Sequence, residues 1–484
     1  MGVPGRAVLA VAAQDRVTTI SYMSSVLPFL VGVLIFVIGL AVSIALHELG
    51  HLTAAKAFGV KVTQYMIGFG KTVFSFRRGE TEYGVKMLPF GGYIAMIGMF
   101  PPKHPGEAPR DASTGFYNSL VLTDGAVGAP AAERAQQRRS VLGTMAEEAR
   151  QASADTIPQG EEHRAFYLLH PFKRIIVMLA GPFMNLVIAC VLIVIMLCGI
   201  GVPGPSTTLQ TVSECLKPAS STSTTCGASD PASPAAAAGL KPGDRIVSVG
   251  GAAITSWDQL STTIQGSAGR TLPVVVERDG KDVTLQVTPK KTQDQVTDQK
   301  TGHTVTKDVG MIGITPTNVF QPQPLGTAIT ATGQQLGQVT GVFVNLPQRM
   351  VGIWNAAFGA GERSASSPVG IIGVGRMAGE IADSSTYAFV SKIQLMLSLL
   401  ASLNLALFVF NMIPLLPLDG GHIAGAVWEW IKRGWFKATR RSSSPKPVDM
   451  ARLMPLTYAV IVVLGAMSLL LAYADIVKPV TLPG

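Results

Sequence analysis

The chain has few charged residues for its length. Only 14 % of its 484 residues are Asp, Glu, Lys or Arg, whereas 48 % are hydrophobic. A soluble protein normally carries roughly a quarter charged residues. Together with 51 glycines and 31 prolines, this deficit indicates a membrane protein and argues against a disordered chain.

The sequence also lacks the features of a nucleic-acid-binding protein. Its formal charge of +9 would suit such a partner, but neither a stacking motif nor a nucleic-acid-binding fold signature accompanies the charge. Lys and Arg instead gather beside apolar segments, so we interpret the positive charge as a topological signal.

Four apolar segments are long enough, at about 20 residues, to cross a bilayer as helices. They cover residues 26–46, 175–199, 390–413 and 456–473. Basic residues follow the first segment and the third, and they also precede the second: Lys56, Lys61, Lys71, Arg77, Arg78, Lys173, Arg174, Lys432, Arg433, Lys437, Arg440 and Arg441. The positive-inside rule therefore places these two loops in the cytoplasm, and both termini and residues 202–386 outside.

Cysteine is scarce, with four residues in all. Cys190 and Cys198 fall in the second apolar segment, where we expect them to pack. Cys215 and Cys226 lie in the exported, Ser/Thr-rich stretch. Oxidising conditions there permit a disulfide with a structural role.

The strongest chemical signal is the motif His47-Glu48-Leu49-Gly50-His51 at the end of the first apolar segment. Helical residues four apart share one face, so the two imidazoles can bind one metal ion. The glutamate between them can take a proton from the attacking water of a hydrolysis. A chance match is the alternative, but ionisable groups within a membrane span have a functional interpretation by default.

A catalytic zinc site needs a third protein ligand. Asp419 follows an apolar stretch broken by Pro414 and Pro417, on the predicted cytoplasmic side, and is the best candidate. The prolines prevent a regular helix there, and the following glycines permit close backbone approach. Two alternatives remain: Asp419 could cap a following helix, and His422 could be the ligand.

Three asparagines fall within apolar segments, where unpaired amides are costly. Asn404 and Asn411 are seven residues apart and so share a helix face, and Asn185 lies in the second segment. They could contact substrate or tie helices together. The site interpretation is favoured for Asn411 and stays open for Asn404 and Asn185.

Taken in order, these motifs resemble the site-2 protease family, in particular its bacterial RseP-like branch. The matching pieces are His47-Glu48-x-x-His51, Ala180-Gly181-Pro182-x-x-Asn185, and Asn411-x-x-Pro414 leading into Leu418-Asp419-Gly420. The resemblance implies an intramembrane zinc metalloendopeptidase in which His47, His51 and Asp419 bind Zn²⁺ and Glu48 is the general base.

The same resemblance assigns roles to the regions between the helices. Residues 62–98 read as short strands that would hold an unwound substrate by strand addition, with Gly68 and Gly70 added to the three asparagines as candidate substrate-binding residues. The turn at residues 239–244 is similar to that of a PDZ domain. A single such domain is typical of the actinobacterial type and would act as a size filter, with peptide contact possible. Expected partners are the bilayer and single-span substrates such as anti-sigma factors or signal-peptide remnants.

Two other functions fit parts of the sequence. A zinc transporter could use the same ligands, but it needs a polar path through several helices, and these segments are mostly apolar. A PDZ scaffold with a structural metal would not need Glu48, which is not required as a ligand.

The predicted fold is therefore a polytopic α-helical protein of the bacterial cell membrane, with four transmembrane helices, a membrane-associated β-hairpin region and one extracytoplasmic PDZ (α/β) domain. Translation is expected to start nearer Met23, without a signal peptide.

The predicted segments are an N-terminal extension (1–22), transmembrane helix 1 (23–60), the β region (61–102), a cytoplasmic insertion that is partly helical and partly disordered (103–165), transmembrane helix 2 (166–201), a linker (202–235), the PDZ domain (236–320), a juxtamembrane region (321–386), transmembrane helix 3 (387–421), a basic cytoplasmic loop (422–451) and transmembrane helix 4 (452–477).

Overall fold

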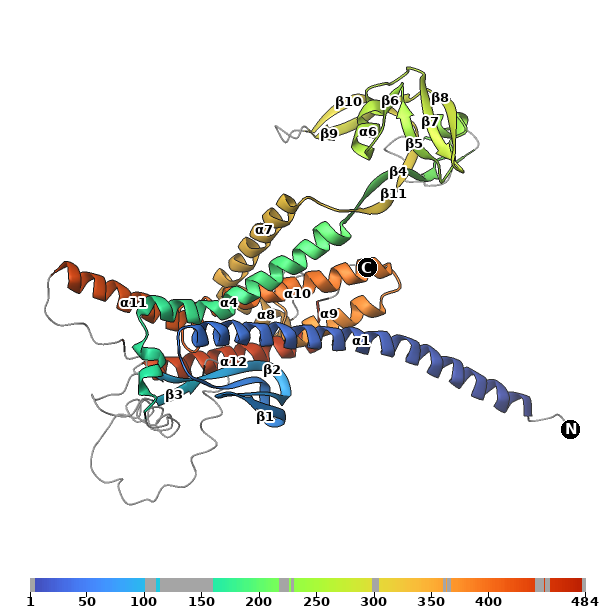
Figure 1. Cartoon of the computed structure of the whole chain (residues 1–484). Coiled ribbons are helices and arrows are strands. Elements are labelled where there is room, and N and C mark those ends of the chain that lie inside the picture. Colours follow the sequence, from blue (N-terminus) through green and yellow to red (C-terminus); the bar gives the residue numbers. More distant parts are fainter. Residues whose placement is uncertain are drawn as a thin grey trace. The chain divides into compact units, whose positions relative to one another are not determined.

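The structure, a computed structural model, divides the chain into two compact units (Figure 1). The first contains the residues up to Met196 and from Pro324 onward, and the second is Leu197–Gln323. The structure describes residues 5–100, 110–113, 160–216, 226–227, 230–297, 304–359, 363, 367–439, 448 and 453–480. The predicted cytoplasmic insertion at 103–165 lies mostly outside these residues.

Four helices among the described residues are long and apolar enough to cross a membrane, as the sequence predicted. They are α1 (Gly5–Ala57, apolar over Val26–Ala57), α4 (Pro171–Val194, continued by the π-helical turn η4, Ile195–Ile200), α10 (Phe389–Asn411) and α12 (Met454–Val477). The helix α4 packs against both α1 and α10, whereas the main helical neighbours of α12 are α8 and α9 (Figure 1).

Local sequence signals set the ends of these helices. Pro171 occupies the first turn of α4, where a missing N–H costs nothing, and the His170 side chain accepts a hydrogen bond from the Phe172 N–H at 3.4 Å. At the other end, Pro414 and Pro417 follow α10 and prevent it from continuing. The chain turns there and starts α11 at Asp419.

The β region between α1 and α4 is a sheet in the order β1 (Val62–Arg78), β2 (Thr81–Phe100), β3 (Arg110–Ser113). Its register is unusual because the first half of β1 lies between the two halves of β2. Tyr65, for example, pairs with Tyr83 on one side and with Ile94 on the other. Residues 92–94 of β2 pair with β1 on one side, and β3 pairs only with residues 95–100. The other edge of residues 91–94 therefore has no strand partner among the described residues.

This sheet is fixed to the end of α1 and the start of α4 by one apolar core. Its buried members are Leu52, Ala55, Val60, Val62, Ile94, Met96, Met99, Phe166, Val177 and Met178. Two short 3₁₀ turns, η2 (Glu162–Arg164) and η3 (Phe166–Leu168), lead into α4 and contribute Phe166. The core begins one residue beyond His51, so it anchors the helix end that carries the predicted metal ligands.

The segments predicted before and after the third span are largely helical. The juxtamembrane region at 321–386 contains three helices: α7 (Leu325–Val344), α8 (Leu346–Phe358) and α9 (Ile371–Asp383). The predicted basic loop at 422–451 is largely the helix α11 (Asp419–Ala438). Apolar and basic residues are interleaved along α11. Because the prediction used only the number of Lys and Arg residues, it did not recognise this segment as a helix.

A buried ion pair joins α12 to the segment that precedes α9. Arg363 donates to the Asp475 carboxylate at 2.7 Å, and the two side chains are only 2 % and 0 % exposed. The second carboxylate oxygen of Asp475 accepts the Gly373 N–H at 2.9 Å. Arg363 also donates to the carbonyl of Pro368. Each charge therefore has its partner inside the protein, which is the condition for burying it.

The second unit is a small α/β domain. Its sheet has the order β11 (Ile314–Gln321), β4 (Val202–Val212), β5 (Arg245–Val249), β7 (Leu272–Arg278), β8 (Lys281–Val287), with β6 (Ala252–Ala253) beside β5. The helices α5 (Pro234–Ala237) and α6 (Trp257–Gln265) and the hairpin of β9 (Lys290–Thr297) and β10 (Thr304–Met311) complete it. The prediction of a linker at 202–235 is therefore wrong for residues 202–212, which form β4. Cys215 and Cys226 are joined in a disulfide.

The turn that suggested a PDZ domain is fixed by one buried carboxylate. Asp244 accepts the Lys241 N–H at 2.8 Å and two hydrogen bonds from the Arg278 guanidinium at 2.7 and 2.8 Å. Arg278 also donates to the Gly239 carbonyl at 2.8 Å. Burial raises the pKa of Asp244, but the bonds from Arg278 and Lys241 outweigh it, so the pKa lies below its usual value.

Replacing Asp475 with alanine should strongly destabilise the first unit. The change leaves the Arg363 charge buried without its partner, which typically costs about 3–5 kcal/mol. Thermal unfolding of the full-length protein in detergent measures the loss. Glu380→Ala is the control because it breaks the Arg376–Glu380 pair, whose side chains are 34 % and 29 % exposed, at a cost of about 0.5 kcal/mol. Equal losses in both variants would contradict this prediction.

Arg278→Gln should loosen the second unit in a pH-dependent manner. A carboxyl with a lowered pKa in the folded state adds stability above the unfolded pKa of about 3.9, and this stability disappears as the pH falls through the folded value. The variant should therefore differ from the native protein at pH 7 and converge with it at strongly acidic pH. Hydrogen-exchange protection of residues 239–278 in the full-length protein reports this, with Lys291→Gln as an exposed control. A difference that is constant with pH would exclude the explanation.

Candidate active site

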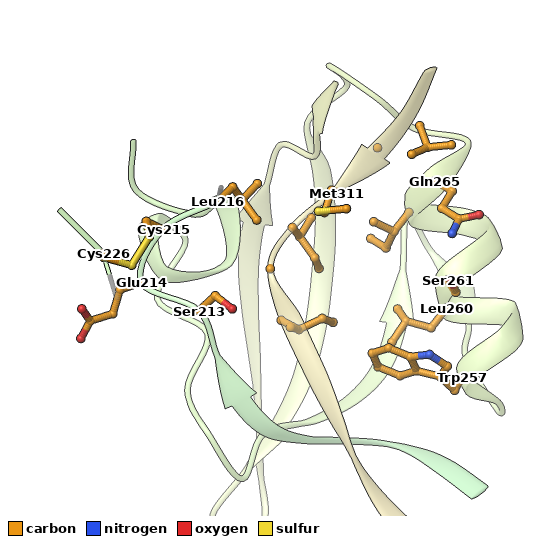
Figure 2. A pocket seen from close by; sticks show the side chains of 16 residues that line it. Ser213, Glu214, Cys215, Leu216, Cys226, Trp257, Leu260, Ser261, Gln265 and Met311 are labelled. Carbon is orange, nitrogen blue, oxygen red and sulfur yellow. A yellow bond between two sulfur atoms is a disulfide. The ribbon is translucent and has the colours of Figure 1, made fainter. Parts of the chain in front are cut away.

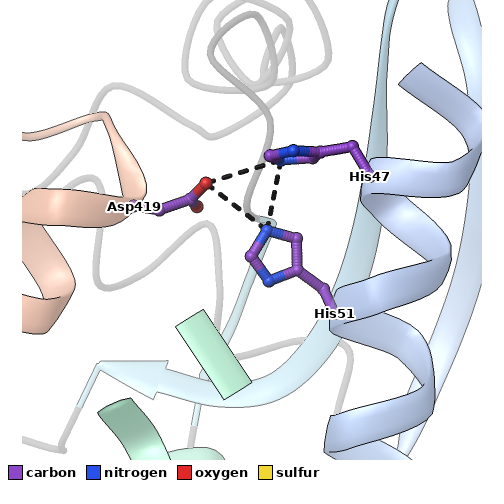
Figure 3. Close-up of side chains that lie close together, drawn as sticks. All are labelled: His47, His51 and Asp419. Atoms are coloured by element: carbon purple, nitrogen blue, oxygen red, sulfur yellow. Dashed lines mark hydrogen bonds and ion pairs between the residues drawn. The ribbon is translucent and has the colours of Figure 1, made fainter. Parts of the chain in front are cut away.

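The histidines of the sequence motif lie on one face of α1, as their spacing predicted. The two Nε2 atoms are 3.3 Å apart, and both rings point toward the start of α11 (Figure 3). His51 is buried, with 1 % exposure. The Glu48 side chain is buried as well and, together with His47 and Asp419, lines a cavity.

The turn after α10 brings Asp419 to these rings. One carboxylate oxygen of Asp419 lies 3.5 Å from the Nε2 atom of His47 and 3.4 Å from that of His51 (Figure 3). The turn is tight enough to require glycine after Asp419, because a Cβ on Gly420 would overlap the carbonyls of Met412 and Ile413. Asp419 therefore owes its position to the two prolines and the glycines that follow it.

The three ligand atoms form a nearly equilateral triangle. In a tetrahedral zinc site, bonds of about 2.0–2.2 Å place neighbouring ligand atoms about 3.3–3.6 Å apart, which matches the measured edges of 3.3, 3.4 and 3.5 Å. Among the described residues this is the single cluster of three His, Cys, Asp or Glu side chains with such spacing. The donor set and its spacing fit a zinc ion with one position left for water or substrate.

The outer nitrogen of each imidazole has a partner from α4. His51 Nδ1 donates to the Val177 carbonyl at 2.8 Å, which leaves Nε2 free to bind a metal. His47 Nδ1 lies 3.1 Å from the Asn185 amide nitrogen, while the amide oxygen of Asn185 is buried without a partner. Rotating the Asn185 amide by 180° exchanges its oxygen and nitrogen. The oxygen then accepts a hydrogen bond from His47 Nδ1–H.

Glycines let α1 and α4 approach closely enough for these contacts. A Cβ on Gly50 would overlap the Ala180 carbonyl, and one on Gly181 would overlap the His51 ring. Small residues at helix crossings serve this purpose in membrane proteins. Gly181 belongs to the Ala-Gly-Pro motif of the sequence, whose physical reason thus becomes visible only in the structure.

The cluster opens into a cavity of about 420 Å³. Its walls come from α1, the edge of β2, α4, the start of α9, α10 and α12, and they are largely apolar. The polar lining residues are His47, Glu48, Asn185, Asn411, Asp419 and Ser468. Such a lining accepts an apolar segment and offers polar groups at one place only.

The structure separates the candidate substrate-binding residues. Asn411 and Asn185 line the cavity. Asn404 is fully buried instead and donates to the Ser43 hydroxyl at 3.0 Å, so it ties α10 to α1. Gly68 and Gly70 do not line the cavity, and His422 lies beside another small cavity with Arg174.

Gly91 and Gly92 also line the cavity, although neither is among the candidate substrate-binding residues predicted from the sequence. They belong to the unpartnered edge of β2, and a Cβ on Gly92 would lie 3.0 Å from Cγ of Glu48. The sequence did contain a signal for this position. Two consecutive glycines in a strand indicate that a ligand or another part of the chain approaches the backbone closely.

A His-Glu-x-x-His motif with an aspartate from a distant segment, among helices long and apolar enough to cross a membrane, is the arrangement expected of a membrane-embedded metalloprotease. The family model for peptidase family M50 matches residues 35–444. The chain belongs to this family, the site-2 protease family, and is a zinc metalloprotease.

Curated relatives agree over nearly the whole length. The zinc metalloprotease Rip1 of Mycobacterium tuberculosis is 32 % identical over 465 residues, covering 94 % of this chain and 99 % of the relative. Rip1 of Mycolicibacterium smegmatis is 31 % identical over 470 residues, with the same coverage. A putative zinc metalloprotease of Neisseria meningitidis is 24 % identical over 432 residues, covering 82 % of this chain and 91 % of the relative.

Asn185→Ala should weaken zinc binding about 10- to 100-fold, the usual effect of removing the partner that orients a histidine ligand. Competition with a chromophoric chelator in detergent measures the affinity. Asn404→Ala is the matched control, since it also removes a buried amide from a membrane helix but touches no predicted ligand. A similar loss in both variants would show that Asn185 acts on helix packing alone.

Proposed function

We propose that this protein is an intramembrane endopeptidase that hydrolyses peptide bonds in the transmembrane segments of single-span proteins. The observation that carries the proposal is the location of the ligand triangle. It lies on a membrane-crossing helix and opens into a largely apolar cavity walled by helices of the same kind. A soluble peptide has no need of such a cavity, whereas an apolar substrate segment fits it.

In this proposal His47, His51 and Asp419 hold the metal. Zinc, when bound, polarises the scissile carbonyl and makes water a nucleophile near neutral pH. The protein keeps the two imidazoles in the required tautomer through Val177 and Asn185. It keeps Asp419 within reach of both rings through the turn that follows α10.

Glu48 is the proposed general base. It follows His47 directly in α1, and its buried side chain lines the cavity. Its carboxylate would accept a proton from the attacking water and deliver it to the leaving amide nitrogen. Gly92 leaves space beside it, because a side chain there would press against Cγ of Glu48.

The unpartnered edge at residues 91–94 is the proposed docking strand for the substrate. A helix hides its carbonyls from a nucleophile, so the scissile segment must be extended before it reacts. Backbone N–H and C=O groups at an open strand edge can hold an extended segment by strand addition. This edge runs beside Glu48, and we therefore place the substrate here rather than at Gly68 and Gly70.

Asn411 is the proposed polar contact to the extended segment. It is the last residue of α10 and lines the cavity. An extended backbone in an apolar cavity has unpaired amides, each of which is costly. The Asn411 amide can offer both a donor and an acceptor to them.

The second unit contains a groove that fits the proposed PDZ role. It has a volume of about 930 Å³ and runs between α6 and residues 309–314, with Leu260 and Met311 facing it and the Cys215–Cys226 disulfide at one side (Figure 2). We propose that this unit lies outside the cell, filters substrates by size and contacts an extended peptide. The proposed topology has both termini outside, and the proposed substrates are anti-sigma-factor-like proteins or signal-peptide remnants.

Cleavage of a tagged single-span substrate by the purified full-length protein tests the proposal. Glu48→Gln should retain zinc and lose turnover, since its carboxylate acts only in the reaction. Asp419→Ala should lose zinc affinity and turnover together, and a chelator should stop the native enzyme. Comparing substrates with and without a folded outer domain tests the size filter in the same assay.

Each outcome separates the candidate functions. Turnover by Glu48→Gln would show that the base is wrong or that another protease contaminates the preparation. A native protein that binds zinc but cuts none of a panel of trimmed single-span substrates would favour a transporter or a scaffold with a structural metal. Zinc flux into vesicles would then distinguish these two.

A further inference from the structure

The second half of α11 carries an exposed surface that the catalytic proposal does not use. We call residues 428–437 the aromatic–basic segment. Trp428, Trp430, Ile431 and Trp435 are 54 %, 50 %, 57 % and 65 % exposed. Three of the five tryptophans of the chain lie in this one stretch. An apolar cluster of this kind on a protein surface usually marks a binding site.

The exposed charges of α11 are all basic. Its acidic residues, Asp419 and Glu429, are buried, and Glu429 is paired with Arg174 of α4 and with Arg433. Lys432 and Lys437 remain exposed, and the Lys432 ammonium lies 5.6 Å from the centre of the Trp428 ring. The surface thus combines tryptophan rings with positive charge and attracts an anionic partner.

The position of the segment identifies that partner. The Trp430 ring lies 6.3 Å from the ring of Phe172, the second residue of the membrane-crossing helix α4. Arg174, in the first turn of α4, reaches Glu429. The segment therefore lies level with the end of a membrane span, at the depth of the lipid headgroups. Trp rings and basic side chains are the residues that membrane proteins place at this boundary.

We propose that the aromatic–basic segment of α11 binds anionic phospholipid headgroups of the adjoining leaflet. The tryptophan rings enter the headgroup region, and Lys432 and Lys437 contact the phosphates. In the proposed topology this is the cytoplasmic leaflet, whose surface is negative. Because α11 begins at Asp419, lipid binding at one end of the helix would hold the proposed metal ligand at the other. The lipid site itself does not depend on the proposed proteolysis.

Tryptophan quenching by brominated lipids tests this site. The full-length protein is reconstituted in vesicles of phosphatidylcholine and phosphatidylglycerol, with bromine on the acyl chains of one lipid or the other. Each basic group near the surface should favour the anionic lipid about fivefold at low salt. Brominated phosphatidylglycerol should therefore quench more strongly than an equal amount of brominated phosphatidylcholine, and salt should reduce the difference.

The variant Lys432→Gln/Lys437→Gln should lose most of this preference. Lys281→Gln/Lys290→Gln is the matched control, because it removes the same charge from the second unit and should keep the preference. A third variant with Trp428, Trp430 and Trp435 all changed to Phe gives the quenching of the remaining tryptophans. A circular-dichroism spectrum and an unfolding temperature in detergent equal to those of the native protein show that each variant is folded.

Three results would overturn the proposal. The first is equal quenching of the native protein by the two brominated lipids. The second is an undiminished preference in Lys432→Gln/Lys437→Gln. The third is unchanged quenching after removal of the three tryptophans, which would mean that protein rather than lipid covers the segment. None of these measurements requires cleavage, so their failure is distinguishable from failure of the proposed protease function.

Discussion

The structure depends on one constraint: polar side chains placed within a membrane must find their partners inside the protein. The hydrocarbon core of a bilayer offers neither hydrogen bonds nor counter-charges. His51 and His47 are therefore tied to α4 through Val177 and Asn185. The close crossing of α1 and α4, with glycine on both helices, follows from the same need, because a larger side chain would separate the rings from their partners.

The same constraint explains the irregular backbone around the site. The turn that leads to Asp419 and the edge of β2 at Gly92 are non-helical, yet both are covered by helices or line the cavity, where backbone groups can remain polar. These irregular segments bring the Asp419 carboxylate and a strand edge close to His47 and Glu48 of α1. A regular helix bundle could not offer an extended substrate any backbone partner.

The few charged residues of the first unit occur in two settings. Inside the first unit, buried charges occur in ion pairs, such as Arg363 with Asp475 and Arg174 with Glu429, which lie near the end of α12 and the start of α4. At the surface, α11 exposes basic groups among tryptophans beside the start of α4. The net charge of +9 thus includes a basic surface on α11 close to the start of α4.

The sequence by itself determined the four apolar spans and the His-Glu-x-x-His motif, because long apolar runs and helical spacing are local properties. It left Asp419 open between a metal ligand and a helix cap, and only the tertiary structure placed its carboxylate beside both histidine rings. Where the local pattern fits more than one structure, only the tertiary structure decided which contacts a residue makes. Asn404 and Asn411 look alike in sequence, yet one ties α10 to α1 and the other lines the cavity. Residues 202–212 read as a linker but become a strand, because they gain β11 as a neighbour from a hundred residues away. Gly92 comes to lie beside Glu48 only through the packing of β2 against α1. Such assignments depend on contacts between segments distant in sequence, which no local pattern encodes.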